Sequence, residues 1–535
     1  MSKSIRIACA IALCCVVARP LHAQSGQTVS FLDVGSERER VLRVLQILGD
    51  VPLYPWSIRP LSPRDEQKLT SKSAAAAALL PVESRAHAFG PLRMKVLPIE
   101  SQAIYNSAFP YGFNDGPIWA GKGLTAAVSG GAAGAIGPLS FQLEPMVFDA
   151  QNSSFALAPG TTAQQPVSGY YGGSIDLPQR FGDKAYKRFD LGQSTVRLDV
   201  GLLDAQLSTA DQWWGPALDS PLILGDNAAG YLHGSVGTAR PVNIGIGHVY
   251  GQVVWGRLEQ SQYSPTRGPD SLRFMSGFAA VLVPRGIPGL ELGVTRFFHS
   301  EWPTNGLGHA PFGRPFEGIL KTSLETVNNP SGTDPDNQLA SVFARWAFPG
   351  SGVEVYGEYG REDHNVDLRD LWEEPDHDAG YTLGLQRAWR RSHGAVIAIR
   401  GEVLNTRLSA LNQGRTQAPW YLHTIFTQGH TELGQLLAAP GGFGGGGSTV
   451  ALDSYSSTGR WTLSWDRTMR AERRGNDGSP NPGGADVLHA LGLDREVRRG
   501  RVSYSMGGQA VWDLNRDFVR DRFNLNLTTG VRAVW

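Results

Sequence analysis

The last stretch of the chain, residues 523–535, reads Phe-Asn-Leu-Asn-Leu-Thr-Thr-Gly-Val-Arg-Ala-Val-Trp. Apolar side chains hold most of its odd positions, from Phe523 and Leu525 to Trp535, and polar or small ones hold the even positions up to Arg532. Because successive side chains of a β-strand point to opposite faces, this alternation predicts a strand with one apolar and one polar face. An amphipathic last strand that ends on an aromatic residue is typical of bacterial outer-membrane barrels. We therefore expect an all-β transmembrane barrel with this apolar face toward lipid.

The same period of two recurs earlier in the chain. Residues 196–202 carry apolar side chains at every even position, and residues 353–359 place Glu354 and Glu358 on one face. A charge inside an otherwise apolar strand needs a wet or paired surrounding, which the lumen of a barrel provides. A soluble β-sandwich also alternates and is kept as the alternative fold, although its polar faces would carry more lysine.

Short turns and long connections predict the order of the strands. Tight turns at 349–352, 391–394 and 498–500 separate alternating runs, and we assign them to the periplasmic side, where bacterial barrels have short turns. Antiparallel strands placed on both sides of these turns, and then along the rest of the chain, number eighteen, which is even, and leave both termini in the periplasm. The strands are expected near residues 92–104, 120–133, 137–148, 169–178, 193–204, 228–237, 242–258, 271–283, 288–299, 339–348, 353–360, 380–390, 395–407, 448–457, 459–471, 486–497, 501–513 and 522–535. The outer loops are then expected at 105–119, 149–168, 205–227, 259–270, 300–338, 361–379, 408–447, 472–485 and 514–521.

Residues 1–23 have the pattern of an export signal. Lys3 and Arg6 precede an apolar run at 7–18 that is too short to cross a bilayer as a helix, and Leu-His-Ala at 21–23 resembles a cleavage site. All three cysteines of the chain lie inside this segment, so we expect a mature chain without disulfides. The 49 basic and 49 acidic residues give a formal net charge of zero, which argues against a nucleic-acid-binding protein.

Residues 24–91 carry helical rather than strand patterns. Apolar side chains recur at helical spacing over 37–48, and Ser62-Pro63 begins a second predicted helix that runs to residue 80. We expect a small periplasmic helical bundle at 24–91 in front of a barrel at 92–535. The bundle either plugs the inner mouth of the barrel or forms an appendage away from the pore.

Eight phrases along the chain resemble one known family. They are Tyr-Gly-Phe-Asn-Asp-Gly at 111–116, Trp-Ala-Gly-Lys-Gly at 119–123, Pro-Gln-Arg-Phe-Gly at 178–182, Trp-Trp-Gly-Pro at 213–216, Asp-Asn-Ala-Ala-Gly-Tyr-Leu-His at 226–233, Tyr-Gly-Glu-Tyr-Gly-Arg-Glu-Asp-His at 356–364, Tyr-Leu-His at 421–423 and Gln-Gly-His-Thr-Glu-Leu-Gly-Gln at 428–435. In this order they resemble the Wzi capsule-assembly outer-membrane proteins, and the resemblance covers nearly the whole mature chain. It implies an eighteen-stranded barrel with a helical bundle at its periplasmic face. It also implies a lectin-like role, in which the protein binds exported capsular polysaccharide or another exopolysaccharide and anchors it at the cell surface. The implied partners are this polysaccharide, outer-membrane lipid and the polysaccharide export machinery.

Candidate sugar-binding residues follow from the chemistry of polysaccharides. Aromatic side chains stack on the apolar faces of sugar rings, while carboxylates and imidazoles hydrogen-bond the hydroxyl groups. The candidates lie in the predicted outer loops, and they are Asp211, Trp213, Trp214, Glu362, Asp363, His364, Trp372, Glu373, Glu374, Trp420 and His430. For the acidic loop 361–379, Ca²⁺ bridging to an acidic glycan and a purely solvated loop stay open as alternatives. Trp213 and Trp214 could equally belong to a loop core or to an interfacial aromatic belt.

Motifs for catalysis and cofactors are absent from the sequence. Residues 116–123 come close to a phosphate-binding loop but lack the Ser or Thr that would hold Mg²⁺, and no His-Glu-x-x-His or Gly-x-Ser-x-Gly occurs. We expect no catalytic residue, no metal and no cofactor, with a hydrolase built from scattered Asp and His at the rim as one alternative. The main alternative function is a porin-like oligosaccharide channel.

Overall fold

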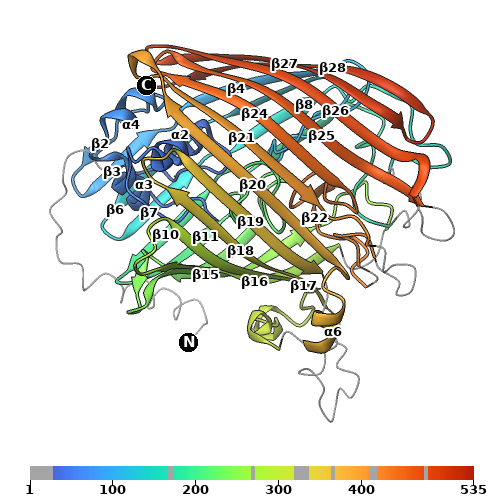
Figure 1. Cartoon of the computed structure of the whole chain (residues 1–535), viewed down its shortest axis with the longest axis horizontal. Helices are drawn as coiled ribbons and strands as arrows, with labels where there is room; N and C mark the ends of the chain where they lie inside the picture. Colours follow the sequence, from blue (N-terminus) through green and yellow to red (C-terminus); the bar gives the residue numbers. More distant parts are fainter. Residues whose placement is uncertain are drawn as a thin grey trace, which may run out of the picture.

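The computed structural model describes residues 28–166, 174–266, 271–318, 336–362, 368–409, 418–423, 425–474 and 480–535. Antiparallel strands dominate, and a few short helices lie mainly near the N-terminus (Figure 1). None of the helices in these ranges has both the length and the apolar character needed to cross a bilayer. The helices are α2 (Glu37–Ile47), α3 (Pro63–Thr70), α4 (Ala74–Leu79) and α6 (Leu368–Glu373), with 3-10 turns η2 (Leu307–His309), η3 (Arg314–Phe316) and η4 (Ser392–Gly394).

The strands fall into a short-stranded first part and a long-stranded second part. The first part comprises β1 (Ile58–Arg59), β2 (His87–Phe89), β3 (Leu92–Val96), β4 (Ile99–Asn106), β5 (Gly123–Ser129), β6 (Ala132–Ile136), β7 (Leu139–Leu143), β8 (Met146–Ala150), β9 (Tyr186–Asp190), β10 (Thr195–Val200), β11 (Leu203–Ser208), β12 (Trp213–Trp214), β13 (Leu232–Thr238) and β14 (Val242–Asn243). The second part comprises β15 (Gly247–Glu259), β16 (Leu272–Pro284), β17 (Leu290–Glu301), β18 (Asp336–Phe348), β19 (Val353–Glu362), β20 (Ala379–Arg390), β21 (Val396–Asn405), β22 (Thr431–Glu432), β23 (Gln435–Leu436), β24 (Gly446–Ser456), β25 (Gly459–Arg474), β26 (Pro480–Arg499), β27 (Val502–Arg516) and β28 (Arg520–Ala533).

Consecutive long strands pair with their neighbours from β15 to β21 and from β24 to β28, and β21 pairs with β24. The last strand, β28, also pairs with β4, from Asn526 opposite Asn106 to Ala533 opposite Ile99. One end of the sheet carries short turns, such as 201–202 and 349–352, and we call it the turn end. The opposite end carries the long connections, such as 209–231, and we call it the loop end.

The last strand alternates as the sequence predicts. On β28 the inward side chains Asn524 and Asn526 are buried, and the outward Phe523 and Leu527 are 49% and 44% exposed. Both asparagines donate their side-chain amides to Oδ1 of Asn106, at 3.0 Å each. A polar inner face and an exposed apolar outer face therefore coexist on one strand.

One predicted strand is wrong, and one strand was missed. Residues 174–178 of the predicted strand 169–178 are irregular, while its residues 169–173 lie outside the described ranges. The chain instead enters the sheet at β9 and β10, turns at 201–202 and returns as β11. Gly201 has a φ of +66°, which a two-residue hairpin turn can require at its first position. The predicted outer loop 205–227 is accordingly shifted to 209–231.

The N-terminal helices pack against the inner face of the sheet. In α2, Leu42 and Leu45 are fully buried in a cluster that includes Ala347 of β18, Ala398 of β21 and Tyr455 of β24. Figure 1 shows these helices, in blue, at the turn end of the sheet. An apolar helix face that is covered by the strands does not belong to a detached appendage.

The predicted helix 62–80 is two helices, α3 and α4. The side chain of Ser62 accepts from the backbone N–H of Asp65 at the start of α3, as the sequence suggests. A second serine, Ser73, accepts from Ala76 and starts α4 after a break at residues 71–73. Serine favours a helix start over a helix interior, which explains the break.

Candidate functional site

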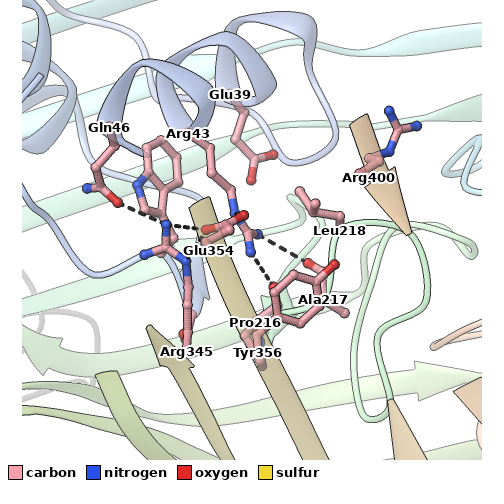
Figure 2. A network of polar contacts seen from close by, with 12 residues as sticks. Glu39, Arg43, Gln46, Pro216, Ala217, Leu218, Arg345, Glu354, Tyr356 and Arg400 are labelled. Carbon is pink, nitrogen blue, oxygen red and sulfur yellow. Dashed lines mark hydrogen bonds and ion pairs between the residues drawn. The ribbon is translucent and has the colours of Figure 1, made fainter. Parts of the chain in front are cut away.

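A buried ion network joins α2 to the inner face of β18 and β19 (Figure 2). Glu354 accepts from Arg43 Nε at 2.9 Å and from Arg345 Nε at 2.7 Å. Arg345 also donates from Nη2 to Gln46 Oε1 of α2 at 3.0 Å. All these charged side chains are at most 1% exposed. Removing one partner from such a network would leave an uncompensated buried charge, so the helix is firmly tied to the strands.

The connection 209–231 folds into the space between the helices and the strands. Arg43 donates from Nη2 to the carbonyl oxygen of Pro216 at 2.7 Å, as Figure 2 shows. The short strand β12 of this connection pairs with β1 of the N-terminal segment, with Trp213 opposite Arg59 and Trp214 opposite Ile58. Two chain segments that hold each other therefore pack together on the inner face of the sheet at this level.

Trp213 and Trp214, two of the sequence candidates, are core residues of this connection. They are 1% and 0% exposed. Arg59 lies over the Trp213 ring at 4.6 Å, and the Trp214 indole donates to Gln212 Oε1 at 3.1 Å. A sugar ring can stack only on an accessible aromatic face, so in this structure both indoles serve packing.

The candidate Asp211 is also buried, close to Asp226 of the same connection. Asp211 Oδ2 accepts from Gln193 Nε2 at 2.6 Å. Burial raises the pKa of Asp226 to about 7, and burial together with the charge of Asp226 raises the pKa of Asp211 well above its usual range. Burial thus disfavours the charged form of Asp211, and its carboxyl group does not face solvent.

Glu362, Trp420 and His430 meet where a second connection, 418–423 and 425–445, folds inward. Glu362 Oε2 accepts from the backbone N–H of Tyr421 at 2.8 Å, and Trp420 donates to the carbonyl oxygen of Asp378 at 3.1 Å. All three candidates are buried, and burial lowers the pKa of His430 to about 3. The imidazole is thus neutral, and these residues fix the inward loop.

Of the candidates that the structure describes, those at or next to α6 reach solvent. Trp372 is 80% exposed, and Glu373 is paired with Arg369 at 2.7 Å on the surface. Glu374 is half-buried, and Asp363 and His364 lie outside the described residues. Within the described ranges, no group of three or more His, Cys, Asp or Glu residues is placed to hold a metal ion.

A cavity of about 230 Å³ opens near the loop end, between the connections 107–122, 151–185 and 437–445. Five of its lining side chains are aromatic, and they are Tyr111, Phe113, Trp119, Phe155 and Phe443. Four others carry amides or guanidinium groups, and they are Gln179, Gln435, Arg470 and Arg516. We call this cavity the outer pocket. It is smaller than the ~300–1,000 Å³ typical of drug-sized ligands, so it suits a small unit such as one sugar residue.

The groups of the outer pocket are held in place by the strands beneath them. Asn106, at the end of β4, donates to the carbonyl oxygens of Tyr111 at 2.8 Å and Ala120 at 3.0 Å. The Tyr111 hydroxyl donates to Gln509 Oε1 at 2.7 Å. Such anchoring lowers the entropic cost of binding, because the pocket walls are already ordered.

The arginines of the outer pocket belong to a second ion network at its wall. Arg470 Nη1 lies 2.7 Å from Asp513 Oδ2 and 3.4 Å from Asp486 Oδ2. Arg516 Nη1 pairs with the same Asp513 oxygen at 2.6 Å. Because carboxylates balance these guanidinium groups, the wall offers directional donors without a large net charge.

Comparison with known proteins identifies the family. The model of the family "Capsule assembly protein Wzi" matches residues 111–515. The chain belongs to the Wzi family. Most of the outer pocket is formed by segments within this match, including the phrases at 111–116, 119–123 and 178–182. No curated protein sequence matches the chain.

Among solved structures, Wzi of Escherichia coli is similar to this chain, with a TM-score of 0.62 and 16% identity over 94% of this chain and 99% of that chain. That protein is an outer-membrane protein involved in group 1 capsule assembly and a carbohydrate-binding β-barrel. At this identity the likeness shows a shared fold. OccK5 (OpdH) of Pseudomonas aeruginosa reaches a TM-score of only 0.39 at 9% identity, covering 83% of this chain and 98% of that chain.

The phrases that resemble the Wzi family contain residues of the outer pocket that are not among the sugar-binding candidates predicted from the sequence. Tyr111, Phe113, Trp119, Gln179 and Gln435 all stand in those phrases and line the outer pocket. These phrases lack the alternation of a β-strand but are rich in aromatic and amide side chains. That combination is the sequence signal that indicates a binding loop. No local sequence pattern predicts that Trp213 and Trp214 fold inward.

Proposed function

We propose that this protein is an outer-membrane barrel that binds exported capsular polysaccharide or another exopolysaccharide and holds it at the cell surface. The observation that carries the proposal is the outer pocket, which combines aromatic faces with anchored amide and guanidinium donors. This is the combination that a sugar ring with its hydroxyl groups requires. Membership of the Wzi family and the likeness to a carbohydrate-binding barrel support the same function.

We further propose that eighteen strands span the membrane. Short interruptions divide four of these spans into the pairs β3 and β4, β5 and β6, β7 and β8, and β9 and β10, and each pair counts as one span. The pairings of β3 with β6, β4 with β5, β7 with β10 and β8 with β9 support this reading, because both halves of each span pair with the same neighbouring span. The pairing of β28 with β4 supports closure of the ring.

In the proposed orientation the turn end faces the periplasm, together with both termini and the helical segment 24–91. Residues 1–23 serve as the export signal. The long connections and the outer pocket then face the outside, where exported polysaccharide arrives. Short periplasmic turns and long outer loops are the rule in bacterial outer-membrane barrels.

The filled lumen favours anchoring over transport. The buried network of Arg43, Glu354 and Arg345 and the pairing of β1 with β12 both lie across the path that a solute would take. We expect little steady conductance from the purified protein in a planar bilayer. Clear unitary current steps would instead favour the porin-like channel.

Sugar binding is tested in the outer pocket. Phe113→Ala removes one aromatic face from the pocket, and Trp372→Ala removes an exposed indole outside it. We expect Phe113→Ala to weaken binding of the cell's own polysaccharide to the purified protein by about 1–3 kcal/mol, a magnitude taken from base–aromatic stacking. We expect a smaller change from Trp372→Ala. Unchanged affinity for Phe113→Ala, with loss for Trp372→Ala, would move the site to the loop around α6.

A further inference from the structure

One connection of the loop end folds over the outside of the sheet. On β16, Met275 and Gly277 face the lumen, where Met275 joins the buried cluster around Trp214, whereas Phe274 and Phe278 point the opposite way. These two outward rings are covered by residues 302–318, which we call the outer strap. Phe274 lies 5.5 Å from Phe312, and Phe278 stacks on Phe316 with centroids 6.2 Å apart. In Figure 1 this segment lies outside the strands, below β16 and β17.

The outer strap binds an arginine that points out of the barrel. Arg296 directly precedes an inward residue, Phe297, in the alternation of β17 and is only 4% exposed. Its Nη2 donates to the carbonyl oxygen of Gly318 at 2.9 Å, and its Nη1 donates to that of Glu317. Its Nε donates to Gln338 Oε1 of β18 at 2.8 Å. The direct acceptors of the guanidinium group thus carry no charge, and the carboxylates of Asp336 and Glu317 lie near enough to attract it.

The covered part of the outward face carries polar side chains as well as aromatic rings. Ser276, Ser300 and Gln338 face outward on β16, β17 and β18, and all three are at most 2% exposed. Farther toward the turn end on the same outward face, Val294 and Val342 are 41% and 55% exposed. The polar outward side chains of these strands therefore lie in the covered part, and the face beyond it is apolar and exposed.

The outer surface of the strap is itself apolar. Phe312 is 44% exposed and Phe316 is 69% exposed, although each has one face against a ring of the wall. Phe316 lies over Phe278, which is opposite Arg296 and thus one outward position away from the exposed Val294. Exposure of these apolar rings to water is unfavourable, whereas contact with lipid acyl chains is favourable.

We propose that the outer strap lies in the outer leaflet of the membrane, with Phe312 and Phe316 among the acyl chains, and that it shields Arg296 from lipid. The proposal commits to lipid as the occupant because the exposed ring of Phe316 lies next to the exposed apolar part of the wall. It rests on the proposed location of the barrel in the outer membrane and is independent of sugar binding. A guanidinium group facing hydrocarbon is strongly unfavourable, and the strap removes that penalty by supplying carbonyl acceptors.

The test uses a spin label at single cysteines in the purified protein in proteoliposomes. The chain has cysteine only at 9, 14 and 15, inside the predicted export signal, so the mature protein offers no competing thiol. Labels are placed at Phe316→Cys, at Val342→Cys as the reference for lipid and at Trp372→Cys as the reference for water. The accessibility of each label to oxygen and to a water-soluble nickel complex is measured. We expect the label at 316 to match the one at 342, with high oxygen and low nickel accessibility.

Each other outcome overturns a defined part of the proposal. Nickel accessibility at 316 as high as at 372, with a lipid-like label at 342, places the strap in water and overturns it. Low accessibility to both reagents at 316 assigns the strap to a protein contact and also overturns it. A water-like label at 342 would refute the membrane location of the wall itself. Phe312→Cys repeats the measurement if the variant at 316 does not fold.

Discussion

Arg345 and Arg296 are both buried in the sheet, but one points into the lumen and the other out of the barrel. Arg345 is bound by two carboxylates, Glu291 and Glu354, and by the side chain of Gln46. Arg296 is bound by backbone carbonyl groups of the outer strap and by Gln338. Arg345 is therefore paired directly with carboxylates, whereas the direct acceptors of Arg296 are uncharged and the carboxylates of Asp336 and Glu317 act on it without a direct hydrogen bond among those described.

The difference follows from what lies beyond each arginine. In the lumen, a carboxylate can come from an adjacent strand, and its pairing with arginines from two segments fastens α2 to the wall. On the outward side, the nearby carboxylate of Asp336 is paired with Arg314 of the strap at 2.6 Å. The donors of Arg296 are satisfied by carbonyl dipoles instead, and these are supplied by a segment that folds over the wall. A buried arginine is thus held by an ion network on the inner face of the sheet and by the outer strap on the outer face.

The strongest way to break the inner arrangement is Glu354→Gln. The variant leaves Arg43 and Arg345 with less compensating charge in a buried site, so we expect a loss of about 3–5 kcal/mol in the free energy of unfolding. The loss is measured by denaturant unfolding of the purified protein in detergent. Glu373→Gln is the matched control, because its pair with Arg369 is exposed and should contribute at most about 1 kcal/mol. Equal effects of both variants would refute the special role of the inner network.

Leu527→Arg tests an outward arginine without a cover. Leu527 faces outward on β28 and is 44% exposed, and the described residues include no strap over it. We expect a cost of up to ~2–4 kcal/mol, seen as a lower yield of folded protein after insertion into lipid vesicles. Thr528→Arg places the same charge at the adjacent inward position and should be better tolerated. Equal yields would contradict the assigned faces of the last strand.

Arg296→Met tests the outer arrangement with a smaller expected effect. The apolar side chain suits the lipid side, but the carbonyl groups of Glu317 and Gly318 lose their donors. We expect a loss of about 1–3 kcal/mol and a strap that is cleaved more rapidly by added protease in intact cells. Arg369→Met, at an exposed site, should leave both measurements unchanged. A strap that stays resistant in the Arg296 variant would show that its aromatic contacts hold it without the arginine.

The smallest expected effect is a pH dependence that comes from Asp226. Its folded-state pKa of about 7 lies above the ordinary value of 3.8 because of burial. The stability that comes from protonated Asp226 is therefore complete below pH ~4 and is lost as the pH rises through about 7. Linkage predicts a fall of about 1.4 kcal/mol between pH 6 and pH 8 from this group. Denaturant unfolding of Asp226→Asn should show a flatter profile in this range, and an identical slope would assign the dependence to another group.

Local patterns predicted the strands that have one polar and one apolar face, such as β28, and the capped start of α3. They failed at 174–178, because a long connection can contain a short alternating run that is not a strand. They also failed for the direction in which the connections fold. Trp214 is buried in a segment that pairs with Ile58. These two positions are far apart in the sequence, so no local periodicity predicts their contact. The outer pocket escaped prediction for the same reason, since its walls come from connections distant in sequence.

The bond between Arg43 and Glu354 joins residues 311 positions apart. Synthesis delivers α2 long before β19, so the helix has to remain available until its partner strand arrives. Contacts of such long range are slow to form, because a large loop must close before any interaction compensates. The helix and the connection 209–231 can enter the lumen freely only while the wall is still open. In the proposed ring, the pairing of β28 with β4 therefore comes late in assembly and locks the interior in place.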